Sequence, residues 1–173
     1  MKKSMVFVNM LTIASLLVLG CSNDNDINCP NDFTGVLSTT EIEFAGVWKF
    51  KDMVSEQDID LTNDQVDNPS TNIYDQLEDC QKDLSYIFEE DRGYILKQGY
   101  EAMNCTNKAM FDGTWKLTSG VLTFVGNCSM ESIDIVFNEN MTQFMFEKTY
   151  KFLDVDGISI TTKVTFTYEK IPN

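Results

Sequence analysis

Five cysteines and no histidine limit the chemistry that this 173-residue chain can perform. Histidine is the usual general base, the commonest metal ligand and the partner of serine and cysteine nucleophiles, so its absence removes most enzyme mechanisms. Pairs of carboxylates remain, as in glycosidases, because the chain holds 27 Asp and Glu residues. The densest run, Glu89-Glu90-Asp91, precedes Arg92-Gly93 between two strand-like segments, which is typical of a solvated hairpin turn. We therefore expect no catalytic residue, no metal and no cofactor.

Cys21 is the one cysteine whose surroundings indicate a modification. It follows Lys2-Lys3 and an apolar stretch over residues 5–19, which is shorter than the ~20 residues that span a membrane. The segment Val18-Leu19-Gly20-Cys21 resembles a bacterial lipobox, in which the cysteine is acylated and becomes the first residue of the mature chain. This resemblance implies a signal peptide over residues 1–20 and a lipid anchor that holds the protein at the outer membrane of the cell envelope. A plain secretory signal is the alternative.

The chain after residue 20 is strongly acidic. Residues 1–20 hold two of the 13 basic residues and none of the 27 acidic ones, so the remainder carries 11 − 27 = −16 charges. That field repels nucleic acid and anionic headgroups, so we expect no nucleic-acid partner and a membrane contact through the anchor alone. Residues 21–40 have the composition of a flexible tether. The patch around Asp24 and Asp26 resembles a signal for export to the cell surface, and a plain spacer is the alternative.

From residue 44 onward, apolar and polar residues alternate with a period of two, which predicts antiparallel strands with one buried face. Eight strands are expected, over residues 46–54, 84–89, 94–100, 114–118, 121–125, 133–137, 144–152 and 158–169. Short turns join most of them, including Asp154-Val155-Asp156-Gly157. The pattern predicts an all-β, eight-stranded, antiparallel up-and-down barrel. The polar segment 55–82 is expected to be a long loop or lid with a short helix near residues 75–82.

Two segments of the chain nearly repeat each other. Residues 44–50 and 111–117 both read Phe-x-Gly-x-Trp-Lys-apolar. In each, a glycine (Gly46 or Gly113) permits close backbone approach, and the following indole (Trp48 or Trp115) can fill a barrel end.

The Gly46-Val47-Trp48 segment is similar to the lipocalin Gly-x-Trp signature. Together with the order of Cys80, Cys105 and the second repeat, it makes residues 44–171 resemble the lipocalin-like domain of small bacterial envelope lipoproteins. We place that domain over residues 41–173. Lipocalins often set an arginine of the last strand against the first tryptophan, whereas the last strand here offers Lys163 and Lys170.

The four remaining cysteines are even in number in an exported chain, which favours two disulfides. Three pairings are possible. We favour Cys80 with Cys105, because each lies just outside a strand of one predicted hairpin, and therefore Cys29 with Cys128. The second bond would attach the N-terminal tether to the barrel.

An eight-stranded barrel is wide enough either to be filled by its own side chains or to hold one small ligand. Its expected lining is rich in aromatic rings: Tyr86, Phe88, Phe144, Phe146, Phe152, Phe166 and Tyr168. We expect a lipid-anchored, lipocalin-like envelope protein that binds a small apolar or amphipathic molecule without catalysis. The alternative is a structural lipoprotein with a filled barrel, whose acidic loop 55–82 contacts a protein or a polysaccharide. The sequence identifies no particular protein partner.

Overall fold

The computed structural model describes residues 28–172. Cys21, the predicted signal peptide over residues 1–20, and the patch at Asp24 and Asp26 lie outside the described residues. The elements, in chain order, are α1 (Thr39–Phe44), β1 (Gly46–Ile59), β2 (Ser70–Asn72), the 3-10 helix η1 (Tyr74–Gln76), α2 (Asp79–Lys82), β3 (Ser85–Phe88), β4 (Gly93–Gln98), β5 (Ala109–Thr118), β6 (Val121–Gly126), β7 (Ser129–Asp134), β8 (Val136–Phe137), β9 (Gln143–Leu153) and β10 (Ser159–Lys170).

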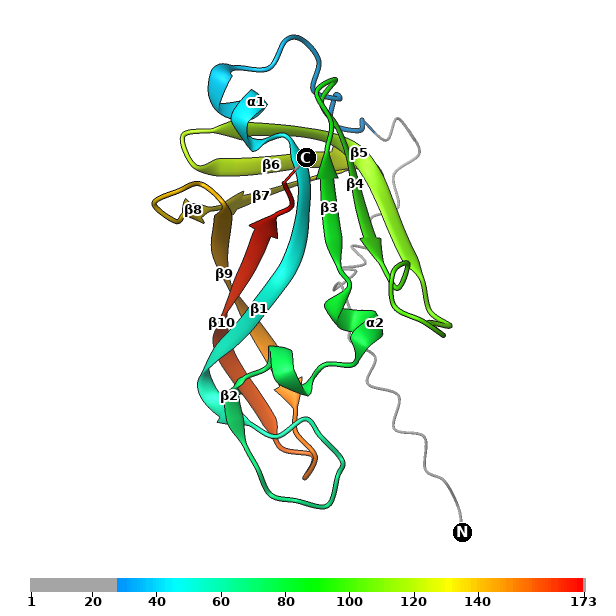
Figure 1. Ribbon diagram of the computed structural model, residues 1–173, viewed down its shortest axis with the longest axis vertical. Helices are drawn as coiled ribbons and strands as arrows, with labels where there is room; N and C mark the ends of the chain where they lie inside the picture. Colours follow the sequence, from blue (N-terminus) through cyan, green and yellow to red (C-terminus); the bar gives the residue numbers. More distant parts are fainter. Residues whose placement is uncertain (1–27, 173) are drawn as a thin grey trace, which may run out of the picture.

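One antiparallel sheet contains all of these strands. Its order is β7-β6-β5-β4-β3-β1-β10-β9-β8, and β2 pairs with β1 off this path. The outermost strands, β7 and β8, are separated in sequence only by Ile135, whose amide donates to the Gly120 carbonyl over 2.7 Å. The sheet therefore curls into a nearly closed barrel (Figure 1). The predicted all-β up-and-down architecture is confirmed.

The strand expected over residues 133–137 is wrong as a single element. The structure divides it at Ile135 into β7, which pairs with β6, and β8, which pairs with β9. The chain bends there because one segment has to leave one sheet edge and reach the other to bring the edges together. Alternating hydrophobicity contains no signal for this change of partner, since both halves keep strand geometry.

The first strand is longer than predicted, and the loop after it is shorter. β1 continues through residues 55–59 and pairs with β10 and β2, although these residues are mostly polar. A register shift between Phe50 and Asp52 turns Met53 and Ser55 inward, and the Ser55 hydroxyl donates to the carbonyl oxygens of Gln57 and Thr71. The short helix expected near residues 75–82 is present as η1 and α2.

The last part of the predicted tether packs against the barrel. The Phe33 amide donates to Thr114 Oγ1 over 2.9 Å, and Leu37 is buried. Helix α1 then begins at a capping box, in which Ser38 and Glu41 each accept a hydrogen bond from the other's backbone amide. Sequence analysis missed this helix, although Ser-x-x-Glu before an apolar residue is a recognised start signal. Ordered packing thus begins upstream of residue 41.

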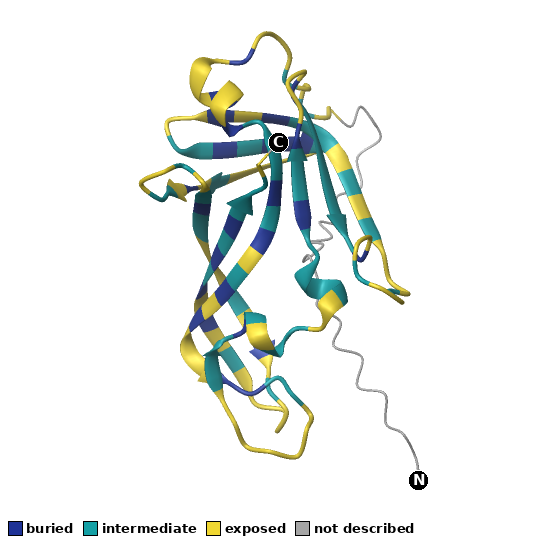
Figure 2. Ribbon diagram, in the orientation of Figure 1, coloured by how far each residue is buried: buried dark blue, intermediate teal, exposed yellow. Residues whose placement is uncertain are grey.

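The core runs through the barrel and is densest at the end that α1 crosses, while β2 and its loop lie at the opposite end (Figures 1 and 2). The largest fully buried side chains are Trp48, Trp115, Tyr168, Phe44, Phe88, Phe144, Met53, Ile59, Ile73, Leu122 and Val164. Ile59 and Ile73 belong to the segment predicted as a loop, so this segment contributes to the core rather than lying wholly in solvent.

Candidate functional site

The two repeated motifs build the closed end of the barrel. Trp48 and Trp115 are both 0% exposed, and Phe44 of α1 lies against them with ring centroids 5.0 and 5.5 Å apart. The Trp48 indole donates to the Phe44 carbonyl over 2.8 Å. Gly113 lets β5 and β6 approach, because a Cβ at this position would lie 2.1 Å from the Val125 carbonyl oxygen. Packed aromatic side chains therefore fill this end of the barrel.

Lys170 of β10 lies against the first tryptophan of the repeated motifs. Its ammonium group lies 5.7 Å from the Trp48 ring centroid and also donates to the Glu43 carbonyl. Lys163, the other basic residue of β10, pairs instead with Glu56 and Glu147 on the outer surface, at 3.3 Å each. A lysine cation of the last strand therefore covers the first tryptophan.

The N-terminal segment is held on the barrel by a buried ion pair that sequence analysis missed. The guanidinium of Arg92 binds both carboxylate oxygens of Glu41, at 2.8 and 3.0 Å, and the two side chains are 7% and 3% exposed. Arg92 also donates to the carbonyls of Gly35, Val36 and Trp115. Burial alone raises the pKa of Glu41, but hydrogen bonds from Arg92, Ser38 and Leu117 outweigh it and lower that pKa to about 2.

The structure brings the seven predicted lining residues together on the inner face. Phe144 stacks on Tyr168 and Phe146 on Phe166, with centroids 5.0 and 4.9 Å apart and ring planes within 8°. Tyr86 stacks on Phe88 and contacts Tyr168 at 5.3 Å. Phe152, further along β9, is buried. One wall of the barrel is thus a row of parallel rings on β9 and β10.

The inner rings are not equally covered. Phe88, Phe144 and Tyr168 are almost completely buried, whereas Tyr86, Phe146 and Tyr150 are half-buried, although they pack against the same core. Along β9, Phe144 and Phe152 are buried, whereas Phe146 and Tyr150 between them are only half-buried, so the looser packing lies in the middle of this strand. The part of the barrel interior around Tyr86, Phe146 and Tyr150 is called the inner site below.

Three tyrosine hydroxyls converge on the inner site. Burial raises the pKa of Tyr168 well above its usual range, and the nearby hydroxyls of Tyr86 and Tyr150 add to the rise. Within residues 28–172, no protein atom hydrogen-bonds any of these three hydroxyls, although every fully enclosed side-chain nitrogen or oxygen there has a partner. The three hydroxyl oxygens therefore border open space inside the barrel, even though Tyr168 as a whole is only 2% exposed.

An ion pair spans the seam beside this site. Lys148 of β9 and Glu131 of β7 are 2.8 Å apart, with side chains 49% and 60% exposed. Lys148 pairs in register with Val164 and Glu131 with Phe124, both buried, so the two charges lie on the inward-facing side of their strands. Glu131 contributes to the raised pKa of Tyr86 and Tyr150, after burial. Hydroxyls and charges thus face one region at the seam.

Both disulfides have the pairing that the sequence favoured. Cys80 of α2 is bonded to Cys105 of the β4–β5 loop, and Cys29 is bonded to Cys128 in the β6–β7 turn. The first bond fastens the helical segment to the neighbouring hairpin. The second fixes the start of the described chain to the barrel wall, 99 residues away in sequence.

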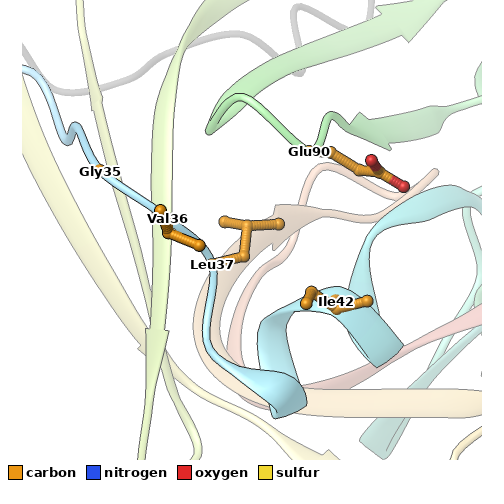
Figure 3. A pocket seen from close by; sticks show the side chains of 5 residues that line it. All are labelled: Gly35, Val36, Leu37, Ile42 and Glu90. Atoms are coloured by element: carbon orange, nitrogen blue, oxygen red, sulfur yellow. The ribbon is translucent and has the colours of Figure 1, made fainter.

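A surface hollow of about 450 Å³ lies beside α1. Figure 3 shows its lining, in which Val36, Leu37 and Ile42 face Glu90 of the β3–β4 turn. Val36 and Ile42 are 93% and 55% exposed, so the hollow is a shallow apolar surface. None of its lining residues belongs to the inner site.

The described residues offer neither a cluster of metal ligands nor a membrane-spanning helix. Across residues 28–172, no three His, Cys, Asp or Glu side chains are grouped so that they could hold a metal ion. The helices of this same part of the chain are all too short or too polar to cross a membrane.

Comparison with known proteins places the chain in a family without assigning it an activity. The comparison with curated proteins found no match. A family model described as a domain of unknown function, DUF5004, matches residues 22–171, which cover the whole barrel and the segment before it. The chain therefore belongs to the DUF5004 family of domains of unknown function.

Proposed function

We propose that this protein is a lipid-anchored envelope lipoprotein whose lipocalin-like barrel binds a small apolar or amphipathic molecule without catalysis. The observation that carries the proposal is the uneven packing of the barrel interior. One end is filled by Phe44, Trp48 and Trp115, while the rings of the inner site, which lie on β3 and β9, are only half-buried. A barrel that served only as a scaffold would gain stability by covering these rings.

Two features support the lipocalin-like assignment. The Gly-x-Trp segment lies at the plugged end of an up-and-down barrel, and the Lys170 cation covers its indole. The lack of histidine supports binding rather than catalysis. The protein's place in the envelope rests on the lipobox-like residues before Cys21, together with two disulfides, which form in oxidising compartments.

The first experiment is native mass spectrometry of the exported protein carrying Cys21→Ser, purified without detergent and measured before and after organic extraction. A stoichiometric extra mass that extraction removes is the expected result. The same sample is then offered fatty acids, quinones and sterol-like probes. If no compound is retained in either experiment, the ligand-binding proposal fails and the filled-barrel alternative, with residues 55–82 as a contact surface, takes its place.

Substitutions inside the barrel locate the bound compound. Phe146→Trp and Phe166→Trp narrow the inner site, so we expect each to weaken uptake about tenfold with little loss of fold. Leu153→Trp is the matched control, because Leu153 is 66% exposed at the end of β9. Uptake that is equal in all three variants would place the ligand elsewhere.

The anchor has its own test. Cys21→Ser is expected to move the protein from the membrane fraction to the soluble fraction of the envelope. Replacement of Asp24 and Asp26 with lysine is expected to reduce the protease accessibility of the protein on intact cells. Accessibility that stays the same in this double variant would leave the acidic patch as a plain spacer.

A further inference from the structure

We infer that the inner site selects a rigid, neutral apolar compound that carries a hydrogen-bond acceptor oxygen, as quinones and aromatic ketones do. This inference rests on the proposed function and adds the chemical class of the ligand. The juxtaposition that carries it is the convergence of the Tyr86, Tyr150 and Tyr168 hydroxyls, with no protein acceptor among the described residues, beside a wall of parallel aromatic rings.

The hydroxyls determine the polar part of the ligand. The three hydroxyl oxygens are reached by solvent and no protein atom of the described residues bonds them, so they can donate to a ligand that displaces water. Tyr168 is 2% exposed, so its hydroxyl borders the interior and not the outer surface. Each phenol offers one O–H donor, and as buried groups they stay protonated at neutral pH. The complementary group is therefore an acceptor oxygen.

The charges around the inner site exclude an anion. Lys148 is the cation on the inward-facing side of β9, and Glu131 neutralises it at 2.8 Å. The chain as a whole carries a net charge of −14. A carboxylate entering the barrel would lose its hydration without gaining an unpaired cation, which is unfavourable. A neutral carbonyl pays no such cost, so it is preferred over an acid of the same shape.

The rings determine the apolar part of the ligand. The planes of Phe146 and Phe166 differ by 7°, and those of Phe146 and Tyr168 by 14°. Rings that stack in pairs turn their faces toward each other, so the row presents ring edges to the barrel interior, as an apolar wall against which a rigid ligand can pack. A flexible alkyl chain would contact the same wall but would lose more conformational freedom on binding.

The test compares compounds that differ in one property each. The exported Cys21→Ser protein is titrated with 2,3-dimethyl-1,4-naphthoquinone, with 2,3-dimethylnaphthalene, which lacks the carbonyls, and with 3-methyl-2-naphthoate, which is charged. Binding is followed by tryptophan fluorescence and native mass spectrometry. We expect the quinone to bind about tenfold more tightly than the hydrocarbon, and the carboxylate to bind more weakly than the quinone.

Variants assign the preference to residues. Tyr86→Phe and Tyr168→Phe remove only the oxygens, and each is expected to weaken quinone binding roughly fivefold while leaving hydrocarbon binding unchanged. Tyr100→Phe is the control, because Tyr100 is 44% exposed outside the barrel. Glu131→Gln frees Lys148 and should strengthen carboxylate binding about tenfold. Thermal unfolding of each variant verifies that the fold is retained. Because Tyr86 and Tyr168 are replaced in separate variants, each variant tests the need for an acceptor oxygen by itself.

The possible results separate the two proposals. If quinone and hydrocarbon bind equally and the tyrosine variants change neither, the protein binds apolar ligands and the acceptor requirement is overturned. If fatty acids or naphthoate bind best to the unmodified site, the neutral class is overturned while ligand binding stands. If neither the test compounds nor the wider panel binds, both proposals fail together.

Discussion

Replacing Glu41 with glutamine tests whether the N-terminal segment is held on the barrel mainly by one buried ion pair. Glutamine has nearly the same shape, but its single side-chain oxygen can accept only one of the two amide hydrogen bonds that Ser38 and Leu117 donate to Glu41. It also leaves the Arg92 charge uncompensated in a site where both side chains are less than 10% exposed. Removal of one partner from a buried pair costs about 3–5 kcal/mol. We expect the free energy of unfolding at pH 7 to fall by about 3 kcal/mol.

The pKa of Glu41 gives an independent value for the same quantity. Its pKa is about 2 in the folded protein against 4.5 for the unperturbed group. The difference of about 2.5 units at 1.36 kcal/mol per unit corresponds to about 3 kcal/mol. Because the folded pKa is the lower one, this stability is present above pH 4.5 and is lost as the pH falls toward 2. The unsubstituted protein should therefore lose stability in this window through Glu41, and Glu41→Gln should not.

The assay is urea unfolding followed by the fluorescence of Trp48 and Trp115, which are fully buried at the plugged end. Unfolding free energies are measured for the unsubstituted protein, Glu41→Gln and the control Glu43→Gln, from pH 7 to pH 2. Glu43 lies on the same helix and is exposed, so its substitution should change stability by less than about 0.5 kcal/mol. A Glu41→Gln curve that stays parallel to the unsubstituted curve, or lies within about 0.5 kcal/mol of it at pH 7, would refute the reasoning.

Three further predictions concern stability. Replacing Cys80 and Cys105 together with serine opens a loop whose ends are 25 residues apart, so calorimetry should show a loss of about 3.5 kcal/mol, and no loss would mean that the reduced chain keeps the loop closed. Gly113→Ala should cost more than about 2 kcal/mol in urea unfolding, because its methyl group would meet the Val125 carbonyl at 2.1 Å, and a neutral result would contradict the close approach of β5 and β6. Above pH 10 the Tyr168 phenol ionises in the unfolded chain but stays protonated in the folded protein, so the free energy of unfolding should fall as the pH rises. Absorbance at 295 nm should then show a phenolate that appears only in denaturant. Full ionisation of the tyrosines of the folded protein at pH 10.5 would contradict this.

Period-two alternation was sufficient to predict the barrel, because a strand with one buried face has apolar residues at every second position. β9 and β10 follow the prediction closely, with Phe144, Phe146 and Phe166 on the inner face. The polar end of β1 and the division at Ile135 were not predictable in this way. Both depend on which neighbouring strand supplies the backbone hydrogen bonds, and the pattern of side chains along one strand does not identify that neighbouring strand.

The candidate site also has a part that the sequence predicted and a part that it did not. Its aromatic rings were predicted because they share the inner face of their strands, but the Glu41–Arg92 pair was missed. Two local signals pointed to it, the Ser-x-x-Glu capping box and the single arginine of an acidic chain, yet 51 residues separate the partners. Their meeting follows from α1 crossing the barrel end above the β3–β4 turn, which local sequence does not specify.

The sequence by itself determined the class of fold, the disulfide pairing that we favoured, and the absence of histidine chemistry, because these follow from residue type, count and local period. Only the tertiary structure decided which rings are packed and which stay half-covered, and that the Tyr86, Tyr150 and Tyr168 hydroxyls converge without a partner in the described chain. The physical reason is that packing density and hydrogen-bond satisfaction are properties of space shared by several strands. No single segment of the chain contains that information.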